Sequence, residues 1–283
     1  MTGDALSLLL FADRIGLNVA ALLAIGFALH AAFGVVERDG FKRLRWLPLA
    51  TAAGVIVFAA ARLLILNAQM GDGTSIFDPE LFPLSWTALG PSTTALVGGA
   101  MLATVALWVG SRVLAAVGAV VLSMGFGLTG HTQGLTEPGV IPTMLASHVF
   151  IAGLWVAAPV TLYPGTAISD AALVARLKRF SAIAIAAIPL LIVLGIWLAW
   201  VLAGGFEPLV GSAYGRLLLL KLAVGLAAMG LGAVNKQMVT ARIVADPAKG
   251  RRWLRLTLTF ETILFAVAIL AVSAATTIAA PDE

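Results

Sequence analysis

Cysteine is absent from the 283-residue chain, and charged side chains are scarce. Without cysteine there is neither a disulfide framework nor a thiolate metal site, so a site for a soft metal ion must use histidine or methionine. Asp, Glu, Lys and Arg make up 11% of the residues, whereas a soluble domain carries about 25%. So few charges cannot cover a water-facing surface of this size, and this excludes an ordinary soluble protein.

Long apolar stretches take the place of the missing charge. Hydrophobic residues make up 60% of the chain, and the mean hydropathy is +1.02. The stretches are rich in Ala, Leu, Val and Gly, which indicates membrane-spanning helices of about 20 residues rather than the alternating strands of an outer-membrane barrel. We predict an all-α integral membrane protein: one transmembrane domain over 1–283, built as a bundle of about eight helices. The predicted spans are 15–36, 46–68, 92–109, 112–130, 141–163, 181–204, 213–235 and 254–279.

The basic residues indicate how the bundle is oriented. Fourteen of the 18 Lys and Arg residues fall in or beside the loops that join spans one to two, three to four, five to six and seven to eight. Because basic residues concentrate in cytoplasmic loops, both termini are predicted to lie outside the cytoplasm. The lipid bilayer is the expected partner of such a protein. No basic-aromatic patch of the kind that binds nucleic acid is present.

Polar side chains inside the spans are the candidates for function, because such groups are costly in lipid and usually face a bundle interior or a water-filled path. They are His30, Arg62, His148, Arg216, Lys221, Asn235 and Glu261, with His131 at the outer end of span four. The basic members are expected to organise polar contacts rather than to bind a cation, since their charge repels one.

Imidazole and thioether groups converge near the outer side of the predicted bundle. His148 lies about 10 Å into span five, and Met144 precedes it by one turn on the same helix face. His131 and Met124 approach from the outer half of span four. These ligand types suit copper, particularly Cu(I), in a chain without thiolates. We therefore predict that His131, His148, Met144 and Met124 form an outer metal site.

His30 and Glu261 lie in the inner halves of spans one and eight. Two interpretations of this pair remain open: a hydrogen-bonded packing clamp, or an inner metal or proton station reached from the outer site.

The second half of the chain resembles the CopD family of bacterial copper-resistance membrane proteins. The residues that carry the resemblance are Gly130-His131, the stretch ASHVFIAGLW with His148 and Trp155, Arg179-Phe180-Ser181, the stretch YGRLLLLKLAVGLAAMGLGAVNK over 214–236, Glu261 and Ala280-Pro281. The resemblance covers roughly 125–283. Val156, Ala157 and Ala158 stand where the family has glycines after the tryptophan.

The resemblance implies passage of copper across the inner membrane, often beside a small periplasmic copper-binding protein. We accordingly predict copper transport or homeostasis, with import from periplasm to cytoplasm, capture at the outer site and an inner relay at His30 and Glu261. No enzyme activity is expected, because the sequence has no phosphate-binding glycine loop, paired-carboxylate site or nucleophile–His–acid arrangement.

Two alternatives remain open. In a b-type membrane cytochrome, His131 and His148 would ligate one haem, and a basic residue would hold a propionate. In a non-transporting copper sensor or delivery protein, the same outer site would bind copper without passing it across the membrane.

Overall fold

The computed structural model describes residues 3–37, 40, 46–71, 73, 75–128, 139–166 and 168–277. Within these ranges every regular element is a helix, as expected for a helical membrane protein. Seven helical stretches of the described chain are long and apolar enough to cross a membrane. They comprise α1 (Gly3–Ala32), α3 (Trp46–Met70), α4 (Phe82–Val109), α7 (Ile141–Val156) with α8 (Ala158–Thr161), α9 (Asp170–Leu202), α11 (Ala213–Val234) with its extension, and α13 (Pro247–Thr277).

The remaining apolar helix, α5 (Arg112–Gly127), is 16 residues long. At 1.5 Å per residue it measures about 24 Å, which is less than the hydrocarbon core of about 30 Å. It pairs closely with α4 and also packs on α1 and α7. The predicted fourth span runs to residue 130, and its last two residues lie outside the described ranges. Eight membrane passes, with both termini periplasmic, therefore stay a prediction.

Several helices begin earlier than the hydropathy predicted. The first, third, sixth and eighth spans were expected to start at residues 15, 92, 181 and 254, whereas α1, α4, α9 and α13 start at Gly3, Phe82, Asp170 and Pro247. A first turn that extends past the apolar core of the membrane lowers the local hydropathy but does not interrupt the helix. The hydropathy therefore places the start of the span too late. At the start of α9, the Ser169 side chain accepts a hydrogen bond from the backbone N–H of Ala172, a favourable N-cap.

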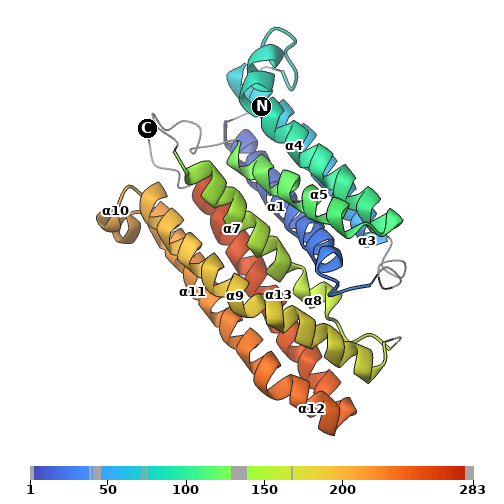
Figure 1. Ribbon diagram of the computed structural model, residues 1–283. Coiled ribbons are helices and arrows are strands. Elements are labelled where there is room, and N and C mark those ends of the chain that lie inside the picture. The colour runs from blue at the N-terminus through green and yellow to red at the C-terminus, as the bar shows by residue number, and fades with distance from the viewer. Residues whose placement is uncertain are drawn as a thin grey trace.

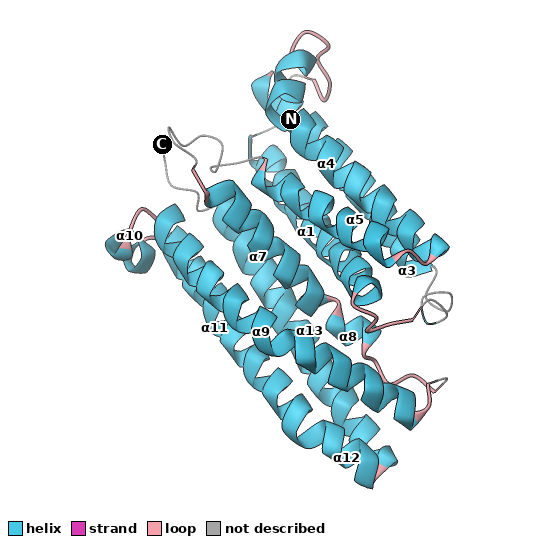
Figure 2. Cartoon of the chain, in the orientation of Figure 1, coloured by secondary structure: helices cyan, strands magenta, loops and turns pink. Residues whose placement is uncertain are grey.

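Figures 1 and 2 show the helices as an up-and-down bundle, in which α1 starts and α13 ends at the same end. Helices α1, α3, α4 and α5 form one group and α9, α11 and α13 form the other, with α7 between them in contact with α1, α5 and α9. Two hydrophobic clusters fill the bundle, one including Leu17, Val55 and Leu122 and the other including Trp155 and Leu254, and both contain residues of α1 and α7 or the turns beside them. Helices α1 and α7 pack against each other where the groups meet.

Small residues set the spacing at this central contact. A Cβ atom added at Gly26 of α1 would overlap the backbone oxygen of Gly153 on α7. Close approach through glycine is common between membrane helices, where packing rather than a hydrophobic effect holds the helices together. It brings the polar residues of α1 within reach of α7 and α8.

Ten of the 14 described Lys and Arg residues lie at the other end of the bundle, where α9, α12 (Thr240–Ala245) and α13 have their polar turns. They are Arg112, Arg176, Lys178, Arg179, Lys236, Arg242, Lys249, Arg251, Arg252 and Arg255. Arg38, Lys42, Arg43 and Arg45, counted with them in the sequence, lie outside the described residues. This clustering agrees with the expected cytoplasmic side.

Candidate functional site

His148 is buried on α7, with its imidazole between α9 and α11. The Nζ atom of Lys221 on α11 lies 3.5 Å from His148 Nε2. On the other side, a Cβ atom added at Gly195 of α9 would lie 3.1 Å from His148 Cε1, so the missing side chain at 195 makes room for the ring. All three residues lie about 10 to 12 Å from the outer ends of their helices, and so they form one layer.

The two ring nitrogens of His148 have different environments. Nδ1 is buried and has no hydrogen-bond partner. The Leu191 carbonyl, one turn before Gly195, interacts with the imidazole, but not at the geometry of a hydrogen bond to Nδ1. Because an ammonium group can only donate, the Lys221 Nζ group donates to Nε2, and in the neutral ring the proton is on Nδ1. A metal ion would therefore bind Nε2 only after displacing Lys221.

The predicted outer ligands are placed differently from one another. Met144 lies one turn before His148 on α7. It is partly buried and packs against the hydrophobic cluster that residues of α7 and α9 help to form. Met124 on α5 exposes 52% of its surface, whereas His148 exposes 9%. We therefore leave Met124 out of the site, because it lies on the outside of the bundle. His131 lies outside the described residues.

His30 is fully buried, and both of its ring nitrogens have partners. Nε2 lies 2.9 Å from the Leu154 carbonyl oxygen and Nδ1 lies 2.6 Å from Thr161 Oγ1. Since a carbonyl only accepts, Nε2 carries the proton and Nδ1 accepts from the Thr161 hydroxyl. Phe180 of α9 packs edge-on against the ring at 5.5 Å. No lone pair remains for a metal ion, so the structure favours the packing-clamp interpretation for His30.

Glu261 is buried on α13 and bonds to Asn235 rather than to His30. Its Oε1 atom accepts from Asn235 Nδ2 at 3.0 Å, and Asn235 Oδ1 accepts from the Thr257 hydroxyl at 2.5 Å. Asn235 is the first residue of a π-helical turn, η1 (Asn235–Val239), that links α11 to α12. Such turns occur frequently at functional sites. The expected His30–Glu261 pair is thus replaced by two separate polar groups, one at each side of the bundle.

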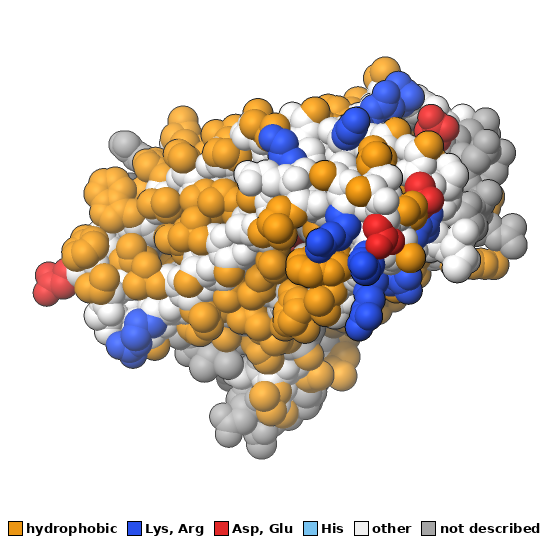
Figure 3. Space-filling model, turned by 90° about the horizontal axis from the view of Figure 1, so that it is seen from below, with side chains coloured by type: hydrophobic (Ala, Val, Ile, Leu, Met, Phe, Trp, Pro, Cys, Tyr) orange, Lys and Arg blue, Asp and Glu red, His pale blue; other side chains and the backbone are white. Residues whose placement is uncertain are grey.

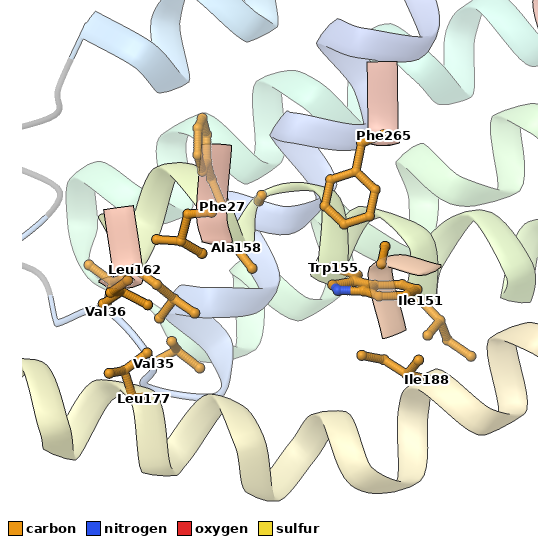
Figure 4. Packing of buried hydrophobic residues seen from close by; sticks show 14 of the residues in the cluster. Phe27, Val35, Val36, Ile151, Trp155, Ala158, Leu162, Leu177, Ile188 and Phe265 are labelled. Carbon is orange, nitrogen blue, oxygen red and sulfur yellow. The ribbon is translucent and has the colours of Figure 1, made fainter. Parts of the chain in front are cut away.

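An aromatic layer lies between the His148 layer and the Glu261 group. Trp155, two turns below His148 on α7, contacts Phe265, one turn above Glu261 on α13, with ring centroids 5.3 Å apart. Figure 4 shows these two rings together with Ile151 and Ile188. An ion moving from the outer polar layer to the inner one would have to pass this apolar contact.

Arg62 and Arg216 lie toward the outer ends of their helices. Arg216 is exposed and donates to the Gly211 carbonyl oxygen at 3.1 Å. Arg62 interacts electrostatically with Asp13 of α1, a carboxylate that is buried without a hydrogen-bond partner. The neighbouring Arg14 donates to the Thr276 carbonyl oxygen of α13. Sequence reasoning missed Asp13 and Arg14, because the first span was expected to start after them.

Of the predicted soft-metal ligands, His148 and Met144 lie one turn apart on one face of α7. Among the described residues, no group of three or more His, Asp and Glu side chains could hold a metal ion. An imidazole and a thioether are a ligand pair that suits Cu(I), but two ligands need a third from elsewhere in the chain or from a partner.

The comparisons with known proteins give one match. Residues 174–275 match the family model described as CopD, copper resistance protein D. Neither the search of curated proteins nor that of solved structures finds a match. The matched segment spans α9, α11 and α13 and includes Gly195, Lys221, Asn235 and Glu261. His148 on α7 lies before it.

Proposed function

Because residues 174–275 match the CopD copper-resistance family, we propose that the protein moves copper ions across the bacterial inner membrane, from periplasm to cytoplasm. The family match supports a role in copper resistance or homeostasis. The direction, the path and the ligands are part of the proposal. A small periplasmic copper-binding protein is the partner that would deliver the ion.

The observation that carries the proposal is the environment of His148. Its imidazole is buried in the outer half of the bundle between α9 and α11 of the matched segment, and its Nε2 atom faces the flexible side chain of Lys221. Met144 adds a thioether on the same helix face. We propose that Cu(I) binds His148 and Met144, with His131 as a third ligand. The flexible side chain of Lys221 then has to move away from Nε2, since its charge repels the ion.

The inner part of the path is proposed to use Glu261 and Asn235 and not His30. Glu261 is a carboxylate below the aromatic layer, and its Oε1 atom is held by Asn235. His30 has both nitrogens engaged. Passage between the outer and inner groups requires the Trp155–Phe265 contact to open, so we expect transport to proceed through alternating conformations and not through a permanent pore.

Uptake of Cu(I) into proteoliposomes tests the proposal. The His131→Ala/His148→Ala double variant is expected to lose uptake and to bind less copper by metal analysis, whereas Ser147→Ala, an exposed neighbour on α7, retains both. Lys221→Leu removes the competing charge without adding a ligand, so its affinity for Cu(I) is expected to rise about tenfold or more, while Lys221→Arg shows no gain. Wild-type uptake by the double-histidine variant would contradict the outer site.

The same preparations separate the two alternatives. Copper binding without uptake would favour the sensor or delivery protein. A Soret band in protein made under haem-replete conditions, lost on His148→Ala, would favour the cytochrome. We expect neither.

A further inference from the structure

A pocket of about 590 Å³ lies at the basic end of the bundle, on the first turns of α13. It is lined by Lys249, Arg252, Trp253, Arg255, Leu256 and Thr259. An adjoining hollow of about 460 Å³ lies between α12 and α13 and shares Lys249 and Trp253. Figure 3, which views the molecule from below, shows Lys and Arg side chains beside hydrophobic ones on that face. The proposed copper path does not use this region.

The cations of the pocket are only partly neutralised. Lys249 forms an ion pair with Asp246 at 3.5 Å, and its backbone N–H donates to the same carboxylate, which lowers the pKa of Asp246. Arg251, which does not line the pocket, is bound to Asp170 at 2.7 Å. Arg252 and Arg255 are exposed, and no ion pair to either is found among the described residues. These two guanidinium groups are planar forks of N–H donors, which match the oxygens of a phosphate group.

An apolar strip continues from the pocket toward the middle of α13. Trp253, Leu256, Phe260 and Ile263 expose between 42% and 55% of their surfaces. Their spacing of three and four residues places them on one face of the helix. Arg242 lies over the Trp253 ring, 5.1 Å from its centroid, and so holds the indole at the edge of the pocket. The site thus has a cationic part at the end of the bundle and an apolar part toward the middle of α13.

We propose that this pocket binds an anionic phospholipid of the inner leaflet. Arg252 and Arg255 hold the headgroup phosphate, and one acyl chain lies along Leu256 and Phe260. The match between a phosphate with attached hydrocarbon and a site with adjoining cationic and apolar surfaces supports a lipid over a soluble phosphate. Basic pockets of this kind at the cytoplasmic ends of membrane helices are suited to anionic headgroups.

Binding of fluorescent phosphatidylglycerol to the purified full-length protein in a zwitterionic detergent tests the proposal. The Arg252→Gln/Arg255→Gln double variant is expected to weaken binding about fivefold or more. The matched control is Lys178→Gln/Lys236→Gln, which removes the same charge from exposed sites at the same end of the bundle and should change binding less than twofold. Arg252→Lys/Arg255→Lys, which keeps the charge, should restore part of the affinity. Thermal unfolding verifies that each variant is folded.

The outcomes are separable. Equal weakening in the test and control pairs would show diffuse attraction to the basic end and would overturn the site. So would unchanged binding in the arginine pair. Competition by inorganic phosphate at the concentrations at which phosphatidylglycerol competes would assign the pocket to a soluble phosphate instead. Failure of the copper-uptake test leaves this result unaffected, because the two sites share no residue.

Discussion

At the scale of single residues, His30 and His148 show how the same side chain takes opposite roles in one bundle. His30 donates through one nitrogen and accepts through the other, and it joins α1 to α7 and α8. His148 has one nitrogen without a partner and the other facing an amine. The lone pair of His148 Nε2 faces only the flexible side chain of Lys221, which can move away, whereas that of His30 Nδ1 is held by Thr161. This difference makes His148 the candidate ligand.

Substitution of His30 by alanine tests its structural role. The variant loses two buried hydrogen bonds and leaves a cavity beside Phe180, so we expect a loss of about 2–4 kcal/mol of stability. Thermal unfolding in detergent should show a lower melting temperature. Copper bound per folded molecule should stay at the wild-type value. A folded His30→Ala protein with reduced copper binding would instead place His30 on the path.

Some of these roles were accessible from the sequence. Met144 and His148 share a helix face by their spacing alone, which periodicity predicts. Spacing could not show whether Met124 faces the bundle interior or the lipid, because an apolar helix does not indicate in its sequence which face packs against other helices. Asp13 was missed because the hydropathy placed the start of the first span at residue 15, whereas α1 starts at Gly3.

At the scale of helices, the contact between α4 and α5 depends on glycine. A Cβ atom at Gly99 would overlap the Leu122 backbone nitrogen of α5, whereas nothing lies within 4 Å of a Cβ atom at the neighbouring Gly98. The two positions form a matched pair on one helix.

Gly99→Val is expected to push α4 and α5 apart and to cost about 1–3 kcal/mol. Gly98→Val should be close to neutral, because the added side chain enters open space. Melting temperatures of the two variants in the same detergent measure the difference. Equal melting temperatures would contradict the close packing of these helices.

Helix ends were the less predictable part of each element. The apolar centres of the spans agree with the helices, because lipid requires that backbone groups pair within the segment. The starts of α9 and α13 were misplaced, because polar turns can continue a helix into the interfacial region. Arg176, Lys178 and Arg179 therefore lie on α9 and not in a loop.

At the scale of the whole molecule, the absence of cysteine makes the topology directly testable. Single cysteines at Ser75 and Val140, both exposed in the structure, lie at the end of the bundle expected to face the periplasm. A third, at exposed Lys178, lies at the opposite end. A membrane-impermeant maleimide should label the first two in intact cells and the third only after permeabilisation. Labelling of Ser75→Cys but not Val140→Cys would mean that α5 does not cross the membrane.

The sequence by itself determined the class of protein. The scarcity of charge, the long apolar stretches and the placement of basic residues in loops on one side of the membrane are local properties of the sequence, and their effects add up. They therefore predict a helical membrane protein without knowledge of its packing. The family resemblance, which the match over 174–275 confirms, likewise depends on residues close together in the chain. Only the tertiary structure decided which polar groups meet: His30 with Thr161, His148 with Lys221, and Glu261 with Asn235. Partners separated by 26 to 131 residues are chosen by how whole helices pack, and neither local spacing nor hydropathy contains that information.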